Sequence, residues 1–131
     1  ECPLYIDFIQ AASYGDSTVS SGNVKILKDL DSSISGRNVL IVEDIVDSGL
    51  TLQSILELFG ARKPKSMRTA SLLAKPGKYA AHLPLNYCGF EIEDHFVVGM
   101  GMDYKGLYRN LDHIAIIDPA KQAGALHDNH T

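Results

Sequence analysis

The 131-residue sequence has no tryptophan, only two cysteines and no excess of basic residues. Cys2 and Cys88 are too few for a disulfide framework, so we expect reduced thiols. Twelve Lys and Arg residues against sixteen Asp and Glu residues give a net charge of −4, which disfavours non-specific binding to nucleic acid. No apolar run approaches the roughly 20 residues that cross a bilayer, and no signal-peptide pattern opens the chain. We therefore expect a cytoplasmic protein that binds neither membranes nor nucleic acid.

Hydrophobic residues make up 45% of the chain, an ordinary share for a globular protein, and the length suits a single domain over residues 1–131. Segments rich in β-branched and aromatic residues predict strands at 4–9, 24–27, 38–42, 68–73, 87–92, 96–98 and 113–117. The segment 38–42 is apolar at consecutive positions, which is typical of a strand buried on both faces of a parallel sheet.

One amphipathic helix is predicted over residues 50–59, because Leu52, Ile55, Leu56 and Phe59 recur at helical spacing. Gly60 is the expected residue after its last turn, and Pro64 prevents continuation. A strand, this helix and the next strand form a βαβ unit with a parallel pair. The predicted fold class is therefore α/β, with a mainly parallel twisted sheet flanked by helices.

Two polar segments lie outside these elements. Residues 13–23 form a long, glycine-bearing loop, which is either a plain connection or a lid. Residues 124–131 lose all periodicity and are expected to form a flexible tail.

An acidic turn follows the apolar strand and leads into the helix. It contains three carboxylates and then two hydroxyl residues around a glycine: Glu43, Asp44, Asp47, Ser48, Gly49 and Thr51. A helix N-terminus at the carboxyl end of a parallel strand suits a phosphate, and a glycine lets the backbone approach it. Carboxylates beside a phosphate suit ribose hydroxyls or hydrated Mg²⁺. The alternative is that Ser48 only caps the helix and the acids favour its dipole.

The stretch from Val42 to Thr51 resembles the phosphoribosyl-pyrophosphate (PRPP) motif of type I phosphoribosyltransferases, and the downstream residues resemble the hypoxanthine/guanine branch of that family. The resemblance covers residues 3–119. It implies the type I phosphoribosyltransferase fold with a small C-terminal hood element.

The resemblance also implies a role for each residue of the motif. Glu43 and Asp44 would bind the ribose hydroxyls, directly or through Mg²⁺, and the loop from Asp47 to Thr51 would wrap the 5′-phosphate. In this loop Leu50 contributes its backbone. Asp47 would lie near N7 of the purine and accept its proton.

Further roles fall on the second half of the chain. Lys75 would donate to the 6-oxo group of the purine, Phe96 would stack on its face, and the Val97 backbone would read its edge. Asp103 would hold a second Mg²⁺ near the purine, and Arg109 would bind pyrophosphate. Without the resemblance, Lys75 reads as a solvated lysine, Phe96 as core, and Arg109 as an exposed residue paired with an acid.

The implied reaction moves the 5-phosphoribosyl group from PRPP to N9 of hypoxanthine or guanine, giving IMP or GMP and pyrophosphate. Ser13 and Tyr14 match the start of the family's flexible catalytic loop, and relatives are commonly homodimers or homotetramers. Two alternatives are a PRPP-binding regulator on the same fold and a transferase that prefers xanthine or guanine.

Family members also carry an upstream strand, a Lys-Gly loop that binds pyrophosphate, and a helix, none of which this sequence contains. We therefore expect a fragment of a longer protein. The alternatives are a partner that supplies the missing part and a chain that is not a competent catalyst.

Overall fold

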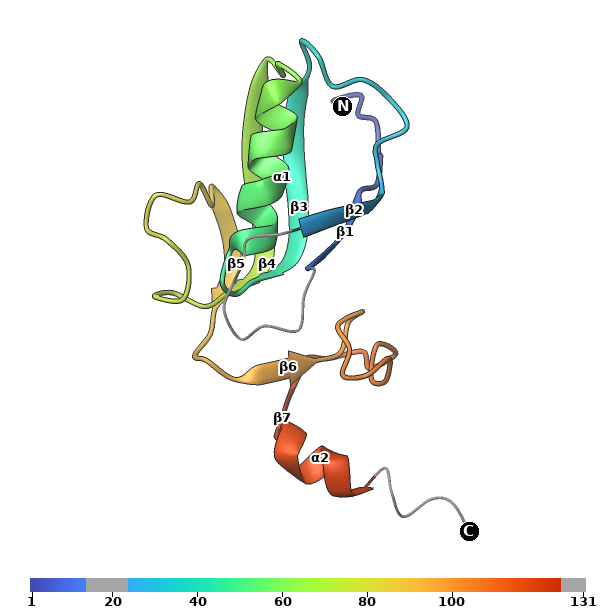
Figure 1. Ribbon diagram of the computed structural model, residues 1–131, viewed down its shortest axis with the longest axis vertical. Helices are drawn as coiled ribbons and strands as arrows, with labels where there is room; N and C mark the ends of the chain where they lie inside the picture. Colours follow the sequence, from blue (N-terminus) through green and yellow to red (C-terminus); the bar gives the residue numbers. More distant parts are fainter. Residues whose placement is uncertain (14–23, 126–131) are drawn as a thin grey trace. The chain divides into compact units, whose positions relative to one another are not determined.

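The computed structural model describes residues 1–13 and 24–125. Tyr14 and most of the predicted loop lie outside the described residues, as do residues 126–131 of the predicted tail. The chain divides into two compact units, Glu1–Glu91 and Ile92–Thr131 (Figure 1). No helix in the described part of the chain is long and apolar enough to cross a membrane.

The first unit is built on a parallel sheet with strand order β3-β4-β5. Its strands are β3 (Asn38–Val46), β4 (Ser66–Ala74) and β5 (Tyr87–Glu91), and α1 (Leu50–Ala61) connects the first two. The register runs from Asn38 opposite Ser66 to Val46 opposite Ala74, so β3 and β4 end side by side. This arrangement confirms the predicted α/β class and the βαβ unit.

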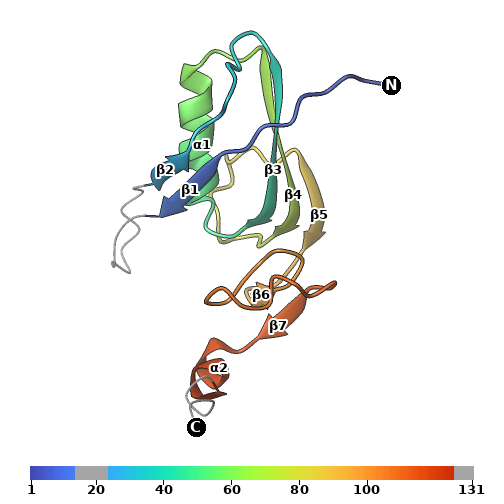
Figure 2. The same cartoon turned by 90° about the vertical axis from the view of Figure 1, so that its right-hand side faces the viewer.

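Helix α1 covers one face of this sheet (Figures 1 and 2). Its apolar positions Leu52, Ile55 and Phe59 are each 3% exposed. They join Ile41, Val46, Ala74 and Leu83 in one hydrophobic cluster. An amphipathic helix is stabilised mainly by such burial rather than by its own propensity. The core of the first unit therefore lies directly behind the turn that joins β3 to α1.

The prediction that residues 38–42 are buried on both faces is wrong. Ile41 faces α1 and is buried, but Leu40 is 55% and Val42 74% exposed. Successive strand residues face opposite sides of a sheet, and these two lie on the face away from the helix. An apolar run in a strand indicates that both of its faces are suited to burial. It does not show that the described chain covers both faces.

The predicted strand at 4–9 is also wrong, since the first strand is β1 (Gln10–Ser13), which pairs antiparallel with β2 (Val24–Lys28). Residues 4–9 pair with no strand in the described chain. Asp7 instead accepts backbone hydrogen bonds from Asp31 and Ser32 at 2.9 and 3.2 Å. Side-chain capping of a neighbouring turn takes the place of a β-ladder in this segment.

The end of the helix differs from the prediction as well. Gly60 lies inside α1, and the left-handed conformation falls on Lys63, with φ of 56°. Arg62 and Lys63 donate to the carbonyls of Phe59 and Gly60 and close the last turn. Pro64 follows at once, as predicted, and cannot continue the helix.

The second unit contains β6 (Phe96–Val98) and β7 (Ala115–Ile117), paired antiparallel, and α2 (Pro119–Ala125). Asp118 Oδ1 accepts a 3.0 Å hydrogen bond from the Ala120 amide and caps α2, while Pro119 occupies the first position of the helix. Residues 124–125 of the predicted tail form the end of this helix.

Candidate active site

The turn between β3 and α1 requires glycine at position 49 for two reasons. Gly49 has φ of +76°, a conformation that other residues adopt only at a cost. A Cβ atom at this position would lie 2.6 Å from Leu83 Cδ2 and 2.9 Å from Tyr79 Cβ. The segment after β4 is therefore packed directly onto this turn.

The amides in the first turn of α1 have no acceptor within the helix. The first intrahelical hydrogen bond of α1 runs from the Gln53 amide to the Gly49 carbonyl at 2.8 Å, and the preceding amides of a helix have no intrahelical acceptor. The cap residue Gly49 has no side-chain capping bond, and Ser48 Oγ lies 3.5 Å from the Leu50 amide, at the limit of a hydrogen bond. Helix capping alone therefore does not explain Ser48.

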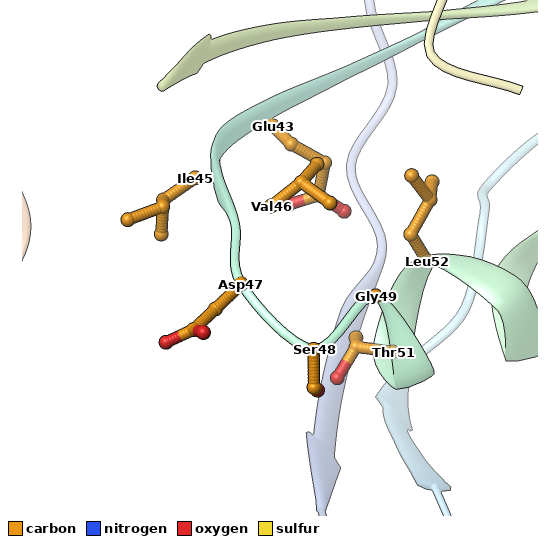
Figure 3. A pocket seen from close by; sticks show the side chains of 8 residues that line it. All are labelled: Glu43, Ile45, Val46, Asp47, Ser48, Gly49, Thr51 and Leu52. Atoms are coloured by element: carbon orange, nitrogen blue, oxygen red, sulfur yellow. The ribbon is translucent and has the colours of Figure 1, made fainter. Parts of the chain in front are cut away.

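A pocket lies at this turn, and Figure 3 shows the Asp47–Gly49 segment leading from β3 into α1. Eight residues line the pocket: Glu43, Ile45, Val46, Asp47, Ser48, Gly49, Thr51 and Leu52. Five of them are residues predicted for the ribose-phosphate site. Backbone amides, two hydroxyls and the positive end of the helix dipole together suit an anion.

The two consecutive acids of the strand have different surroundings. Glu43 is half-buried and lines the pocket, whereas Asp44 is exposed and accepts a 2.6 Å hydrogen bond from the Ile45 amide. Burial, with a smaller contribution from the negative charge of Asp44, raises the pKa of the Glu43 carboxyl above its ordinary value. A ligand hydroxyl or a cation beside this half-buried carboxylate would stabilise its charged form.

Lys75 and Asp47 are brought together by the sheet itself. The Lys75 amide donates to the Val46 carbonyl at 3.0 Å and extends the β3–β4 pairing by one residue. Asp47, the residue after β3, and Lys75, the residue after β4, are then neighbours. Lys75 Nζ lies 3.1 Å from Asp47 Oδ2. Lys75 is only 5% exposed. The simple reading of a solvated surface lysine is therefore wrong.

The second oxygen of Asp47 has a different environment. Oδ1 is buried and accepts no hydrogen bond from the described residues. Lys78 Nζ lies 3.4 Å from it, close enough for an ion pair but without hydrogen-bonding geometry. A buried acceptor without a hydrogen bond is costly in a folded protein. Asp47 Oδ1 is thus suited to accept a hydrogen bond or a proton from a ligand.

The remaining predicted residues belong to the second unit. Phe96 is 42% exposed, so it is not core, and its ring meets the Tyr104 ring edge-on at 5.5 Å. Val97 lies in β6 opposite Ile116. Arg109 donates to the Gly101 carbonyl at 2.7 Å and lies 3.3 Å from Asp103, so in this structure the arginine is paired with an acid.

The structure thus gathers Glu43, Asp47–Gly49, Thr51 and Lys75 in the first unit, and Asp103 with Arg109 in the second. Ser13 ends β1. No group of three or more His, Cys, Asp or Glu side chains that could hold a metal is found among the described residues. Lys78, which lies beside Asp47, was not predicted from the sequence. The turn-forming residues between Lys75 and Lys78, which include Gly77 at φ of +85°, could have indicated that the chain turns back and places Lys78 near Lys75.

Comparison with known proteins is consistent with this site. Residues 1–105 match a family model described as the phosphoribosyl transferase domain. The hypoxanthine-guanine phosphoribosyltransferase of Bacillus subtilis is 54% identical over 117 residues, 89% of this chain and 65% of that protein.

Solved structures agree. A crystal structure of a hypoxanthine-guanine phosphoribosyltransferase from Bacillus anthracis has 48% identity and a TM-score of 0.80, covering 86% of this chain and 66% of that one. The hypoxanthine phosphoribosyltransferase from Trypanosoma cruzi, in complex with its product IMP, has 40% identity and a TM-score of 0.81, covering 90% and 62%. The chain therefore spans a little under two thirds of the length of these relatives.

Proposed function

Because the chain belongs to the phosphoribosyl transferase domain family, we propose that the protein transfers the 5-phosphoribosyl group of PRPP to N9 of hypoxanthine or guanine. The products are IMP or GMP and pyrophosphate. One observation carries the proposal: a carboxylate with a buried oxygen that accepts no hydrogen bond from the described residues, Asp47 Oδ1, lies between an anion-binding turn and a buried lysine.

The turn from Asp47 to Thr51 holds the 5′-phosphate. Its free backbone amides and the Ser48 and Thr51 hydroxyls donate to the phosphate oxygens, with Leu50 contributing its amide. Glu43 and Asp44 accept hydrogen bonds from the ribose hydroxyls. Fixing both ends of the ribose phosphate orients its C1 toward the base.

The donor set also fits Mg²⁺, which in proteins is held by one or two carboxylates together with substrate oxygens and water. Glu43 and Asp44 would hold one ion and Asp103 another. A bound Mg²⁺ would neutralise charge on the pyrophosphate as it leaves.

The purine is recognised by a donor and activated by an acceptor. Lys75 donates to the 6-oxo group, Phe96 stacks on the ring, and the Val97 backbone and Asp103 read the purine edge. Asp47 takes the proton from N7 as N9 attacks C1, so the base becomes more nucleophilic as positive charge develops on the ribose. Arg109 binds the departing pyrophosphate.

We further assign the protein to the cytoplasm and to a homodimer or homotetramer, and we assign Ser13 and Tyr14 to the catalytic loop. These assignments rest on the family resemblance.

A Mg²⁺-dependent assay with PRPP and hypoxanthine, guanine or xanthine tests the proposal. Asp47→Asn keeps the size of the side chain and removes the proton acceptor, so turnover should fall about a hundredfold or more. Asp31→Asn is the matched control, because Asp31 is exposed and its ion pair with Lys28 lies outside the proposed site. Equal activity of Asp47→Asn and wild type would refute the role of Asp47.

Calorimetry with IMP and PRPP separates the alternatives. Binding of PRPP without turnover of any base would indicate a regulator, and turnover of xanthine in preference to hypoxanthine would indicate the xanthine-preferring enzyme. A folded chain that binds neither ligand would refute the proposed function.

A further inference from the structure

Asp47 faces two ammonium groups. Lys75 Nζ lies 3.1 Å from Oδ2, and Lys78 Nζ lies 3.4 Å from Oδ1. Asp47 can therefore give up one of the two lysines to a ligand and still remain paired.

The two lysines are not equivalent. The Lys75 side chain is 7% exposed and that of Lys78 is 39% exposed. Lys75 lies at the buried end of β4, and its position is fixed by the backbone bond to Val46. An ammonium that is largely removed from water gains most from a ligand acceptor, so Lys75 is the lysine that turns to the ligand.

When Lys75 turns away, Asp47 would lose its shorter contact. Leaving a partly buried carboxylate without a cation costs free energy. This cost would weaken the binding of the ligand. Lys78 removes the cost because it stays beside Oδ1.

Lys78 is held in this position by its neighbours. Its amide donates to the Lys75 carbonyl at 3.2 Å and closes a turn. Tyr79 and Leu83, which follow it, pack against Gly49 in the turn between β3 and α1. Leu83 is 7% exposed. The segment that carries Lys78 is thus anchored to the loop that contains Asp47.

We propose that Lys78 is a positioning residue that keeps the Asp47 carboxylate paired and oriented while Lys75 donates to the oxo group of the purine. The inference rests on the proposed function. It predicts that Lys78 affects the affinity for a ligand that accepts a hydrogen bond from Lys75 more than the affinity for a ligand that does not.

Calorimetry on the full chain with IMP and with ribose 5-phosphate tests this difference, since only IMP carries the oxo group. Lys78→Met should weaken IMP binding about fivefold, the size of a half-exposed ion pair, and change ribose 5-phosphate binding by less than about twofold. Lys78→Arg should restore IMP binding because it restores the charge. Lys65→Met, which removes an exposed lysine elsewhere in the first unit, should leave both affinities unchanged.

The outcomes are distinct. Equal loss of both ligands in Lys78→Met, or no loss of either, would overturn the role of Lys78. Failure of the wild-type chain to bind IMP while ribose 5-phosphate still binds would refute the proposed function, and this inference with it. Thermal unfolding checks that Lys78→Met is folded, and Lys78→Gln serves as the second neutral variant if it is not.

Discussion

Replacing Gly49 by alanine gives the sharpest test of how the turn between β3 and α1 is built. The substitution adds a single methyl group. That group must sit on a backbone with φ of +76°, and it must occupy space already filled by Leu83 and Tyr79. Both effects destabilise the folded chain, and they can be separated.

The size of each effect follows from the geometry. A non-glycine residue in the left-handed region costs about 1–2 kcal/mol. Overpacking a filled site costs about 1–3 kcal/mol. The contact at 2.6 Å is with the end of the Leu83 side chain, which can move, but the contact at 2.9 Å is with Tyr79 Cβ, next to the backbone. We therefore expect Gly49→Ala to lower the free energy of unfolding by about 2–5 kcal/mol.

Gly77→Ala is the matched control. Gly77 has φ of +85°, but a Cβ atom there would meet nothing within 4 Å. This variant should show the backbone cost alone, about 1–2 kcal/mol. The difference between the two variants, about 1–3 kcal/mol, then measures the packing of Tyr79 and Leu83 on the turn.

Urea unfolding of wild type and both variants, followed by circular dichroism, provides these free energies. If Gly49→Ala and Gly77→Ala have equal free energies of unfolding, the segment after β4 does not pack on the turn between β3 and α1. The structural support for a fixed Lys78 would then be lost as well.

Three further predictions concern single side chains. Thr69 is fully buried, and its Oγ1 has no hydrogen-bond partner in the described chain, so Thr69→Val should raise the free energy of unfolding by about 1 kcal/mol; a loss in urea unfolding would contradict this. Because the folded-state pKa of Glu43 is raised, the wild type should lose stability relative to Glu43→Gln as pH rises from about 4 to 7, and a constant difference would disprove the shift. The Arg62 guanidinium, at 2.8 and 2.6 Å from the Asp29 oxygens, lowers the pKa of Asp29 to about 2. The stability advantage of the wild type over Arg62→Met should therefore be present at neutral pH and shrink as pH falls toward that value; urea unfolding that shows the same advantage in acid would argue against the pair.

The sequence predicted the parts of the fold that depend on local pattern. The spacing of Leu52, Ile55 and Phe59 identified the buried face of α1, and the apolar run before Glu43 identified β3. The short turn expected before the helix is also present, and Gly49 in it has φ of +76°; the role of this turn in binding an anion stays a prediction.

Other features depend on what a segment meets in space, and the sequence could not show that. Residues 4–9 have strand composition but find no strand partner, and Leu40 and Val42 have core composition but no cover in the described chain. Lys78 was missed because its significance lies in a contact with Asp47 across the sheet edge. The pairing of Arg109 with Asp103 needed the loop conformation of the second unit.

The chain from Asn38 to Lys75 has a consequence for the order of folding. It contains β3, α1, β4 and every proposed site residue of the first unit except Ser13 and Tyr14. The β3–β4 register pairs Asn38 with Ser66, a larger sequence separation than in any other strand pair of the described chain, so closing this βαβ unit costs more conformational entropy than the other pairings. The proposed ligand site of this unit is therefore complete only once β3 and β4 have paired. Under the proposed function, a nucleotide present during refolding would stabilise that core by mass action and draw the equilibrium toward the native state.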